Sequence, residues 1–349
     1  MSKILYLTDY PVGATSGYAT IAKPICNQLV EDGHEVKLVG LSNRGEEHWE
    51  SFGIIAVDSF GEAEAAIHNL SMLWKPDVVI LSLDIPVVQR MIDKIVKPNI
   101  KYLMITPLEN GPLCHDWALS LSQFDKVLFI SQLGEDEARK VGLRNVGHLS
   151  VGVDSDLWRP ASGEEREIAR RNLGFEPDEK IVFTVADNQE RKNLAGGMTI
   201  IKKMKINNPD MKVKYVLVTR EHSPYGWKLQ ELAQSFGIKN DIVIFDRGMT
   251  QEQLRLLYIC ADAFLLPSKA EGLGLPVLEA MSCGIPCVCT ATGALNELLK
   301  DGRGWLVEPE YTVDADVWGN SRRDFISTDL GAIMLKEAIE APNNLPIIT

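Results

Sequence analysis

Several signals that would narrow the function of this 349-residue chain are missing from it. Its six cysteines form no Cys-x-x-Cys pair, and no secretory leader precedes the first apolar run, so we expect reduced thiols and a cytoplasmic location. No apolar run reaches the roughly 18 residues that a membrane-spanning helix needs, which predicts that there is no integral membrane segment. The loop after the first predicted strand is not Gly-x-Gly-x-x-Gly, which argues against a nicotinamide site.

Positive charge is also scarce, because the formal net charge is −12 and the pI is near 5.1. Binding to nucleic-acid phosphates needs clustered lysine and arginine, so the acidity disfavours bulk nucleic-acid binding. Hydrophobic residues make up 45% of the chain, and its length exceeds that of one ordinary core. Two domains are therefore expected.

Short apolar runs alternate with helical stretches along the whole chain. This alternation predicts parallel β/α architecture, with one series of strands before the polar stretch at 163–171 and a second series starting near Ile181. The predicted strands lie at 4–7, 35–39, 78–83, 102–105, 127–130, 181–185, 215–218, 242–245, 263–266 and 286–289. The fold class is therefore α/β with two Rossmann-like β/α/β domains, at residues 1–157 and 158–325, followed by a C-terminal segment at 326–349.

The most informative segment runs from Glu271 to Met281 and follows the predicted strand 263–266. Gly272 and Gly274 let the backbone come close to a ligand, and Pro276 in the first turn of a helix leaves neighbouring N–H groups free to face an anion. An acidic residue on each side of the loop can accept hydrogen bonds from vicinal hydroxyls, as a sugar or a ribose offers. The loop therefore suits a glycosyl nucleotide.

This segment resembles the glutamate, seven residues, glutamate signature of the retaining family-four glycosyltransferases of GT-B fold, also called glycosyl transferases group 1. The resemblance covers about residues 1–310. Other matching segments are Leu266-Pro267-Ser268, Cys283-Gly284-Ile285-Pro286, Arg191-Lys192-Asn193 and Gly33-His34-Glu35-Val36. It implies that the two domains face each other across a cleft, with the first on the acceptor side and the second binding the nucleotide-sugar donor. The segment 326–349 would then return toward the first domain.

The resemblance also implies roles for single residues. Glu271 would hold hydroxyls of the transferred sugar, Glu279 the ribose, and Lys192 the diphosphate. Backbone N–H groups for the donor would come from Gly272, Leu273, Gly274 and Leu275. The ordinary alternatives are that Glu279 is a first-turn glutamate complementing the helix dipole and that Lys192 is a helix-start lysine.

One position departs from the family pattern. The family usually carries an arginine about five residues before this lysine as a second diphosphate ligand, whereas this chain has Asp187 there, followed by Asn188. Both are candidate donor-side residues, and the swap reverses a charge beside a dianion. Arg191 is the candidate replacement, because a guanidinium suits phosphate well.

In the first domain the loop at 10–18 resembles the family's glycine-bearing phosphate loop. Gly17 would supply an N–H group, and Ser16 either a hydroxyl for the donor or a plain N-cap. The loop at 106–117 contributes Glu109 and His115, either of which could position or deprotonate the acceptor, or merely cap a turn.

Two metal-like patterns are set aside. Asp154-Ser155-Asp156 resembles a D-x-D motif but leads into the linker, and Cys283, Cys287 and Cys289 have no histidine nearby. No metal and no cofactor are expected beyond the nucleotide-diphosphate sugar as co-substrate.

The predicted function is therefore metal-independent transfer of a hexose or pentose to an acceptor hydroxyl, with retention implied by the family. The acceptor could be a saccharide, a protein or a modified nucleic-acid base. The competing hypotheses are a non-catalytic nucleotide-sugar or glycan-binding module and a sugar-phosphate synthase or phosphorylase.

Overall fold

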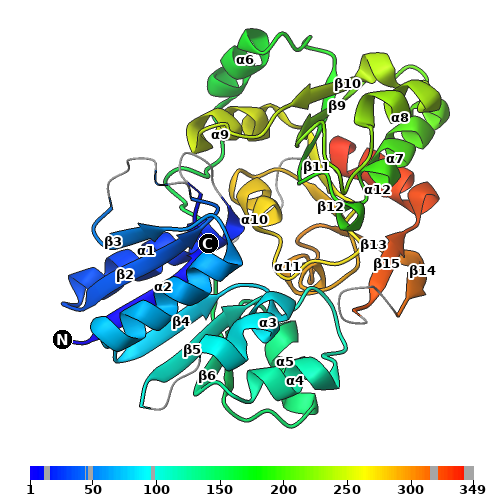
Figure 1. Cartoon of the computed structure of the whole chain (residues 1–349). Helices are drawn as coiled ribbons and strands as arrows, with labels where there is room; N and C mark the ends of the chain where they lie inside the picture. The colour runs from blue at the N-terminus through cyan, green and yellow to red at the C-terminus, as the bar shows by residue number, and fades with distance from the viewer. Residues whose placement is uncertain (12–15, 44, 46–49, 96–98, 315–320, 342–349) are drawn as a thin grey trace. The chain divides into compact units, whose positions relative to one another are not determined.

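The computed structural model describes residues 1–11, 16–43, 45, 50–95, 99–314 and 321–341. Its chain divides into two compact units: Met1–Val151 form the first, and Gly152–Ala315 with the stretch from Arg322 onward form the second. Helices lie on both faces of the sheet in each unit (Figure 1).

The first unit is built on a seven-stranded parallel sheet with the order β3-β2-β1-β4-β5-β6-β7. Most of its strands are followed by a helix, which carries the chain back so that the next strand can pair in parallel. Its elements are β1 (Lys3–Asp9), α1 (Gly17–Glu31), β2 (Glu35–Leu41), β3 (Gly53–Ala56), α2 (Phe60–Leu73), β4 (Val78–Ser82), α3 (Ile85–Ile95), β5 (Lys101–Thr106), α4 (His115–Leu121), β6 (Lys126–Phe129), α5 (Gln132–Lys140) and β7 (Val146–His148).

The second unit repeats this plan on a six-stranded parallel sheet with the order β10-β9-β8-β11-β12-β13. The antiparallel pair β14-β15 forms a separate two-stranded sheet in the same unit. The elements are α6 (Gly163–Asn172), β8 (Lys180–Val185), the 3₁₀ turn η1 (Glu190–Lys192), α7 (Leu194–Asn207), β9 (Val213–Val218), α8 (Leu229–Phe236), the 3₁₀ turn η2 (Lys239–Asp241), β10 (Ile242–Phe245), α9 (Gln251–Cys260), β11 (Ala263–Leu266), α10 (Leu275–Ser282), β12 (Cys287–Thr290), α11 (Leu295–Leu298), β13 (Trp305–Val307), β14 (Pro309–Val313), β15 (Arg323–Ile326) and α12 (Thr328–Glu340).

These observations confirm the prediction of two Rossmann-like domains, since both sheets have the doubly wound strand order. Every apolar run listed from the sequence lies in a strand or overlaps one. The short edge strands β3, β7 and β13 and the hairpin β14-β15 were not predicted. Helix α1 ends where the sequence indicated, because Gly33 adopts the left-handed φ of +84° that stops a helix cheaply.

The two units divide earlier than the predicted position after residue 157. Leu157 and Val153 pack against the core of the second unit, and Trp158 is 3% exposed inside it. The indole of Trp158 meets the ring of Tyr258 edge-on, with centroids 5.3 Å apart. Apolar burial therefore draws the linker into the second unit, and the division falls between Val151 and Gly152.

Helix α12 packs on α7, β11, β12 and β13, which all belong to the second unit. The last residues of the predicted C-terminal segment, 342–349, lie outside the described part of the chain. Its return toward the first domain therefore stays a prediction.

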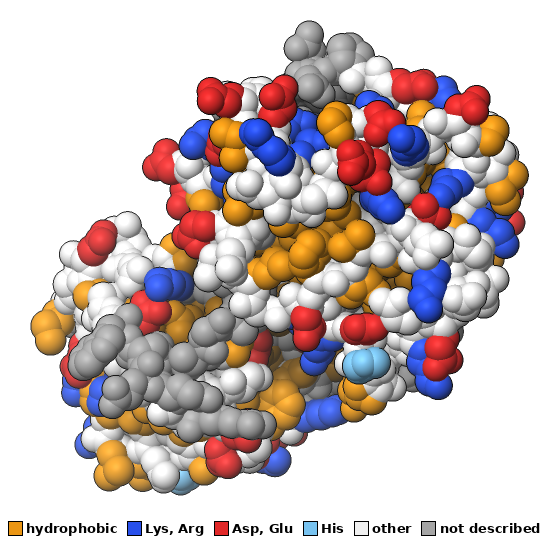
Figure 2. All heavy atoms as spheres, turned by 90° about the horizontal axis from the view of Figure 1, so that it is seen from above, with side chains coloured by type: hydrophobic (Ala, Val, Ile, Leu, Met, Phe, Trp, Pro, Cys, Tyr) orange, Lys and Arg blue, Asp and Glu red, His pale blue; other side chains and the backbone are white. Residues whose placement is uncertain are grey.

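Acidic and basic side chains are interspersed on the face of the molecule that Figure 2 shows, and the blue side chains do not merge into one basic patch there.

The position of Trp158 in the second core gives a stability prediction. Trp158→Ala should lower the free energy of unfolding of the second unit by about 3–5 kcal/mol, because it removes a fully buried indole. Denaturant unfolding of the whole chain measures the loss. Leu256→Ala, which truncates a side chain on a residue that is 43% exposed, serves as the matched surface control. An equal effect of the two substitutions would contradict the placement of Trp158 in the core.

Candidate functional site

The candidate site in the second unit lies where the strand order of the sheet reverses. Strands β8 and β11 are neighbours, with Val182 paired to Ala263 and Phe183 to Phe264. The chain leaves β8 toward β9 and β10 on one side and returns to β11 on the other. The loops that follow β8 and β11 therefore leave the same carboxyl edge side by side, at the point where open α/β sheets bind ligands.

This topology brings together three of the predicted residues, Glu271, Lys192 and Arg191. Lys192 Nζ donates a 2.5 Å hydrogen bond to Oε1 of Glu271, which lies 79 residues away in sequence. The guanidinium of Arg191 is 3.5 Å from Oε2 of the same carboxylate and donates a 2.7 Å hydrogen bond to the carbonyl oxygen of Ala270. We call this the Glu271 cluster.

The Glu271 cluster holds its carboxylate in the charged form. Glu271 is 5% exposed, and burial alone would raise its pKa. The positive charges of Lys192 and Arg191 outweigh that effect and lower the pKa of Glu271 to about 2. Two cations beside one carboxylate leave an excess of one positive charge, so the cluster can accept hydroxyl hydrogens and also attract an anion.

The loop after Glu271 presents its backbone to the same place. Gly274 has a φ of +92°, and a Cβ atom there would come 2.8 Å from Cδ2 of Leu295, so only glycine fits. Helix α10 begins at the next residue, with Pro276 in its first turn. Among the described residues, the N–H groups of Gly272, Leu273, Gly274 and Leu275 donate no hydrogen bond to a backbone or side-chain acceptor of the chain. Amide donors at a helix N-terminus favour an anionic ligand.

Glu279 lies on α10 but not in the first turn, which corrects the dipole alternative proposed from the sequence. Its Oε2 accepts a 2.7 Å hydrogen bond from the hydroxyl of Tyr258. Burial raises the pKa of Glu279 to about 7, against the opposing effect of the Tyr258 hydrogen bond. The Glu279 carboxyl group therefore binds its proton more tightly than an exposed glutamate does.

The negative charge of Asp187 is compensated by two arginines. Arg220 donates to both of its carboxylate oxygens, with Nε 2.7 Å from Oδ1, and Nη1 of Arg247 is 3.4 Å from Oδ1. The three residues follow the adjacent strands β8, β9 and β10. Burial raises the pKa of Asp187, but the hydrogen bond from Arg220 and the charge of Arg247 outweigh it, and the net shift is downward. The charge reversal seen in the sequence is thus neutralised locally.

Asn188 uses its side chain inside the fold. It is fully buried, its amide donates to the carbonyl oxygen of Trp227 at 2.8 Å, and its Oδ1 accepts from the N–H of Trp227 at 2.9 Å. A further 3.3 Å hydrogen bond reaches the carbonyl oxygen of Glu221. The predicted donor-side residue Asn188 therefore fixes the loop at 221–227.

The candidates in the first unit lie on loops at the carboxyl edge of its own sheet. Ser16 is the N-cap of α1, since its Oγ accepts from the N–H of Ala19 at 3.1 Å, and Gly17 is the first residue of that helix. The plain N-cap alternative therefore describes the Ser16 side chain. Glu109 lies in the loop after β5, and His115 is the exposed first residue of α4. Strand β4 separates β1 from β5.

The metal-like patterns have structural uses. Oδ1 of Asp154 accepts from the N–H of Asp156 at 3.0 Å, which closes a turn. Cys287 and Cys289 are fully buried on β12. In the described ranges no three or more His, Cys, Asp or Glu side chains gather in a way that could hold a metal ion. Over the same ranges, none of the helices has the length and apolarity needed to cross a membrane.

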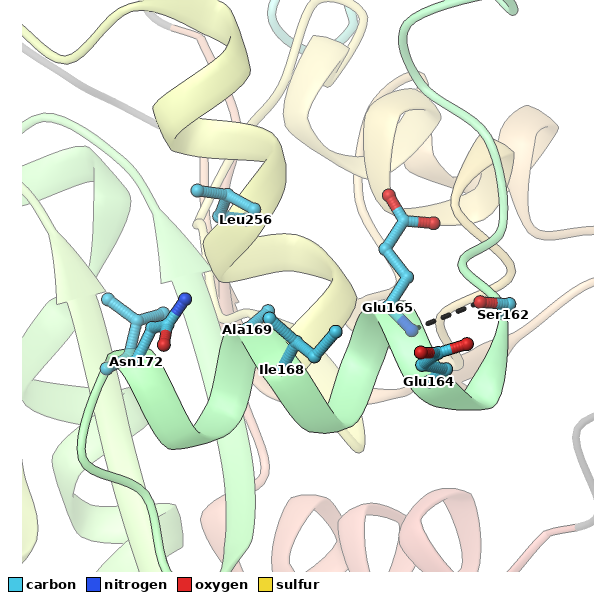
Figure 3. Close-up of a pocket in the computed structure, with 8 residues that line it drawn as sticks. Ser162, Glu164, Glu165, Ile168, Ala169, Asn172 and Leu256 are labelled. Atoms are coloured by element: carbon cyan, nitrogen blue, oxygen red, sulfur yellow. Dashed lines mark hydrogen bonds between the residues drawn. The ribbon is translucent and has the colours of Figure 1, made fainter.

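Two surface hollows lie in other parts of the second unit. One, of about 380 Å³, lies between α6 and α9 and contains none of the predicted site residues (Figure 3). It is lined by Ser162, Glu164, Glu165, Ile168, Ala169, Asn172, Leu173 and Leu256. The other, of about 400 Å³, includes Arg247 and Met249 beyond the end of β10. Glu271 and Lys192 line neither hollow.

Tyr258, Arg220 and Arg247 were missed by the sequence reasoning. The two arginines each follow a predicted apolar strand within two residues, which is the signal that could have found them. Tyr258 lies in the last turn of α9 and carries no such signal.

Comparison with known proteins finds a family whose model matches part of this chain. Residues 165–319 match the model of the family described as glycosyl transferases group 1. A D-inositol 3-phosphate glycosyltransferase from Corynebacterium urealyticum is 31% identical over 198 residues, which make up 54% of this chain and 45% of that relative. The chain spans about half the length of the curated relatives it matches.

Solved structures resemble nearly the whole chain. Sucrose-phosphate synthase from Thermosynechococcus elongatus has a TM-score of 0.77 at 15% identity, covering 97% of this chain and 89% of that one. The Anabaena protein HepE, solved in complex with UDP and glucose, has a TM-score of 0.70 at 17% identity, covering 97% and 90%. At these identities the likeness shows the fold, which agrees with the two doubly wound sheets.

The Glu271 cluster predicts a strong coupling between its members. Lys192→Met should lower the free energy of unfolding by about 3 kcal/mol, because it leaves a buried carboxylate with only Arg191 beside it. In the double variant Lys192→Met with Glu271→Gln, part of this loss should be recovered. Denaturant unfolding of both single variants and the double variant completes the cycle. Additive effects would contradict the direct pairing.

Glu279 predicts a pH dependence of stability. Its pKa is about 7 in the folded chain against 4.5 for the free side chain, so the folded state binds the proton more tightly. Its contribution is fully present below pH 4.5 and is lost as the pH rises through 7, by on the order of 1–3 kcal/mol. Unfolding measured from pH 4.5 to pH 8 should show this loss in the wild type and not in Glu279→Gln. Glu231→Gln, at an exposed glutamate, is the control and should keep the wild-type profile.

Proposed function

We propose that this chain, whose residues 165–319 match the model of the glycosyl transferases group 1 family, transfers a sugar from a nucleotide-diphosphate donor to an acceptor hydroxyl. The observation that carries the proposal is the Glu271 cluster beside the amide groups of 272–275. The transferred group is a hexose or pentose, and the anomeric configuration is retained.

The diphosphate of the donor would bind at the start of α10. The N–H groups of Gly272, Leu273, Gly274 and Leu275 would donate to its oxygens, and Lys192 and Arg191 would supply positive charge. These groups are held in place before the ligand arrives, so little reorganisation accompanies binding. The hydroxyls of the sugar would donate to the carboxylate of Glu271, and those of the ribose to Glu279.

The chemical step follows from where charge develops. As the bond from the anomeric carbon to the diphosphate breaks, negative charge grows on the leaving phosphate and positive charge on the sugar ring. Fixed cations and amides stabilise the negative charge on the leaving phosphate, and the Glu271 carboxylate stabilises the positive charge on the sugar ring. The oxygen of the acceptor hydroxyl attacks from the face on which the diphosphate leaves and gives up its proton. Glu109 and His115 are the candidate bases for taking up that proton. Retention then needs no enzyme nucleophile and no metal.

The two competing hypotheses receive less support. The sequence feature that favoured a non-catalytic module was Asp187 in place of the usual arginine, because its negative charge would repel the diphosphate. The pairing of Asp187 with Arg220 and Arg247 neutralises that charge. A sugar-phosphate synthase is among the structural neighbours, but that likeness concerns the fold. HepE was solved with UDP-glucose, so UDP-sugars are the first donors to test.

A donor-cleavage assay tests the proposal. With UDP-, GDP-, ADP- and TDP-sugars as donors, the wild type should release the nucleoside diphosphate from at least one. Lys192→Ala should lower kcat by about 10²–10³-fold, as loss of a group that stabilises the leaving charge does in other enzymes. Lys228→Ala, at a lysine whose side chain is 79% exposed, is the matched control and should leave the rate unchanged.

Two results would contradict this function. One is binding of a nucleotide sugar, seen as a raised melting temperature, without any release of nucleoside diphosphate under any condition, which would favour the binding module. The other is activity abolished by EDTA and restored by a divalent ion, which would contradict metal independence.

A further inference from the structure

The hairpin β14-β15 grows from the same edge of the sheet as the Glu271 loop. Strand β13 ends at Val307, and β14 starts at Pro309, so the hairpin begins at the carboxyl end of a parallel strand. The loops after β11 and β12 leave that edge as well. The two hairpin strands pair antiparallel, with Tyr311 opposite Phe325 and Thr312 opposite Asp324.

Asp324 fastens the hairpin to these neighbouring loops. Its side chain is nearly inaccessible, with Oδ2 accepting from Thr292 at 2.8 Å and Oδ1 from Thr312 at 2.7 Å. Its N–H donates to the carbonyl oxygen of Lys269 at 2.9 Å, and the hydroxyl of Thr292 donates to the same carbonyl at 3.1 Å. The hairpin is thus bonded directly to the residue two positions before Glu271.

Lys269 makes a second connection through its side chain. It is 4% exposed, and its Nζ lies 4.3 Å from the centroid of the Phe325 ring and pairs with Glu190. Burying a lysine and an aspartate contributes little net stability, because desolvation offsets the attraction. Such buried contacts instead fix geometry, here the position of the hairpin relative to the loop that carries Glu271.

Phe325 also contacts a second aromatic side chain, that of Tyr311. The rings of Tyr311 and Phe325 are stacked, with centroids 4.5 Å apart and an interplanar angle of 16°. Phe325 is therefore in contact with both the Lys269 ammonium group and the Tyr311 ring. Tyr311 ends this stack and is 55% exposed. A large aromatic ring is therefore exposed at the surface of the second unit and stacked on a neighbouring ring.

We propose that Tyr311, stacked on Phe325, is a platform for a saccharide ring, and that the acceptor of the reaction is a saccharide. The inference rests on the proposed function, whose acceptor class it names. One face of a pyranose carries axial C–H groups, which are apolar and slightly positive, and the face of an aromatic ring is negative. The phenol hydroxyl at the rim can in addition bond to a sugar hydroxyl.

The charges beside Tyr311 favour a neutral sugar over a modified nucleic-acid base, whose flat ring could also stack on an aromatic side chain. Glu308 and Glu310 precede Tyr311 and are exposed. Carboxylates accept hydrogen bonds from sugar hydroxyls but repel the phosphates that accompany a nucleic-acid base. Arg322 is drawn toward Asp324, with Nε 3.2 Å from Oδ1. The saccharide therefore fits this surface better than the modified nucleic-acid base does.

Saturation-transfer NMR with methyl α-D-glucopyranoside, methyl α-D-mannopyranoside and methyl α-D-galactopyranoside tests the platform directly. At least one glycoside should receive saturation on its ring protons from the wild type and from Tyr311→Phe, which keeps the ring. Tyr311→Ala should weaken its binding by about 3–10-fold, the value of one aromatic contact. Tyr225→Ala removes a ring from a residue that is 79% exposed elsewhere in the unit, and it should bind as the wild type does.

Two results would overturn the inference: no transfer to any of the glycosides from the wild type, or equal binding by the wild type and Tyr311→Ala. A melting temperature of Tyr311→Ala near that of the wild type shows that the variant is folded, and Tyr311→Phe supplies the comparison if it is not. Because the NMR readout needs neither donor nor turnover, a failure of nucleoside diphosphate release counts against the proposed function and leaves this test intact.

Discussion

The second unit depends on keeping one carboxylate, that of Glu271, charged where it is 5% exposed. An isolated buried carboxylate would take up a proton. Lys192 at 2.5 Å and Arg191 at 3.5 Å prevent this, and they can do so only because β8 and β11 are adjacent at the reversal of strand order. The site is therefore a consequence of topology, and a single ion cluster joins two loops far apart in the sequence.

Neighbouring loops reinforce that cluster. Two side chains fix one end of the loop at 186–193. Asp187 accepts a hydrogen bond from Arg220, and the buried amide of Asn188 donates to the carbonyl oxygen of Trp227. The loop at 267–274 is fixed by the hairpin through Lys269 and Asp324. Preorganised charge is useful in catalysis because it needs no rearrangement as the transition state forms. This gives the buried polar contacts a role that their small net stability does not explain.

The sequence predicted those parts of the fold and the site that follow from local pattern. Apolar runs identified the central strands of both sheets, and the glycines and glutamates at 271–279 identified the loop that joins Glu271 to the start of α10. The short edge strands and the hairpin β14-β15 have too few buried residues to give a clear period. The division between the units falls a few residues before residue 157 because Val153 and Leu157 pack against the second core through contacts that the local sequence does not indicate.

Side-chain partners were the least predictable part. Nothing near Asp187 in the sequence indicates that arginines after two other strands will neutralise it, since only the sheet order places Arg220 and Arg247 beside it. The same holds for Tyr258 and Glu279, which lie 21 residues apart on different helices. Ser16 shows the opposite case, because an N-cap is read from local sequence and the structure has that cap.

A crystal structure of the chain with a bound nucleotide sugar would test the central claim most directly. The account predicts that the diphosphate oxygens lie within hydrogen-bonding distance of Lys192 Nζ and of the N–H groups at 272–275, with sugar hydroxyls on the Glu271 carboxylate. A nucleotide sugar bound elsewhere, with Glu271 and its two cations in contact only with one another, would contradict it.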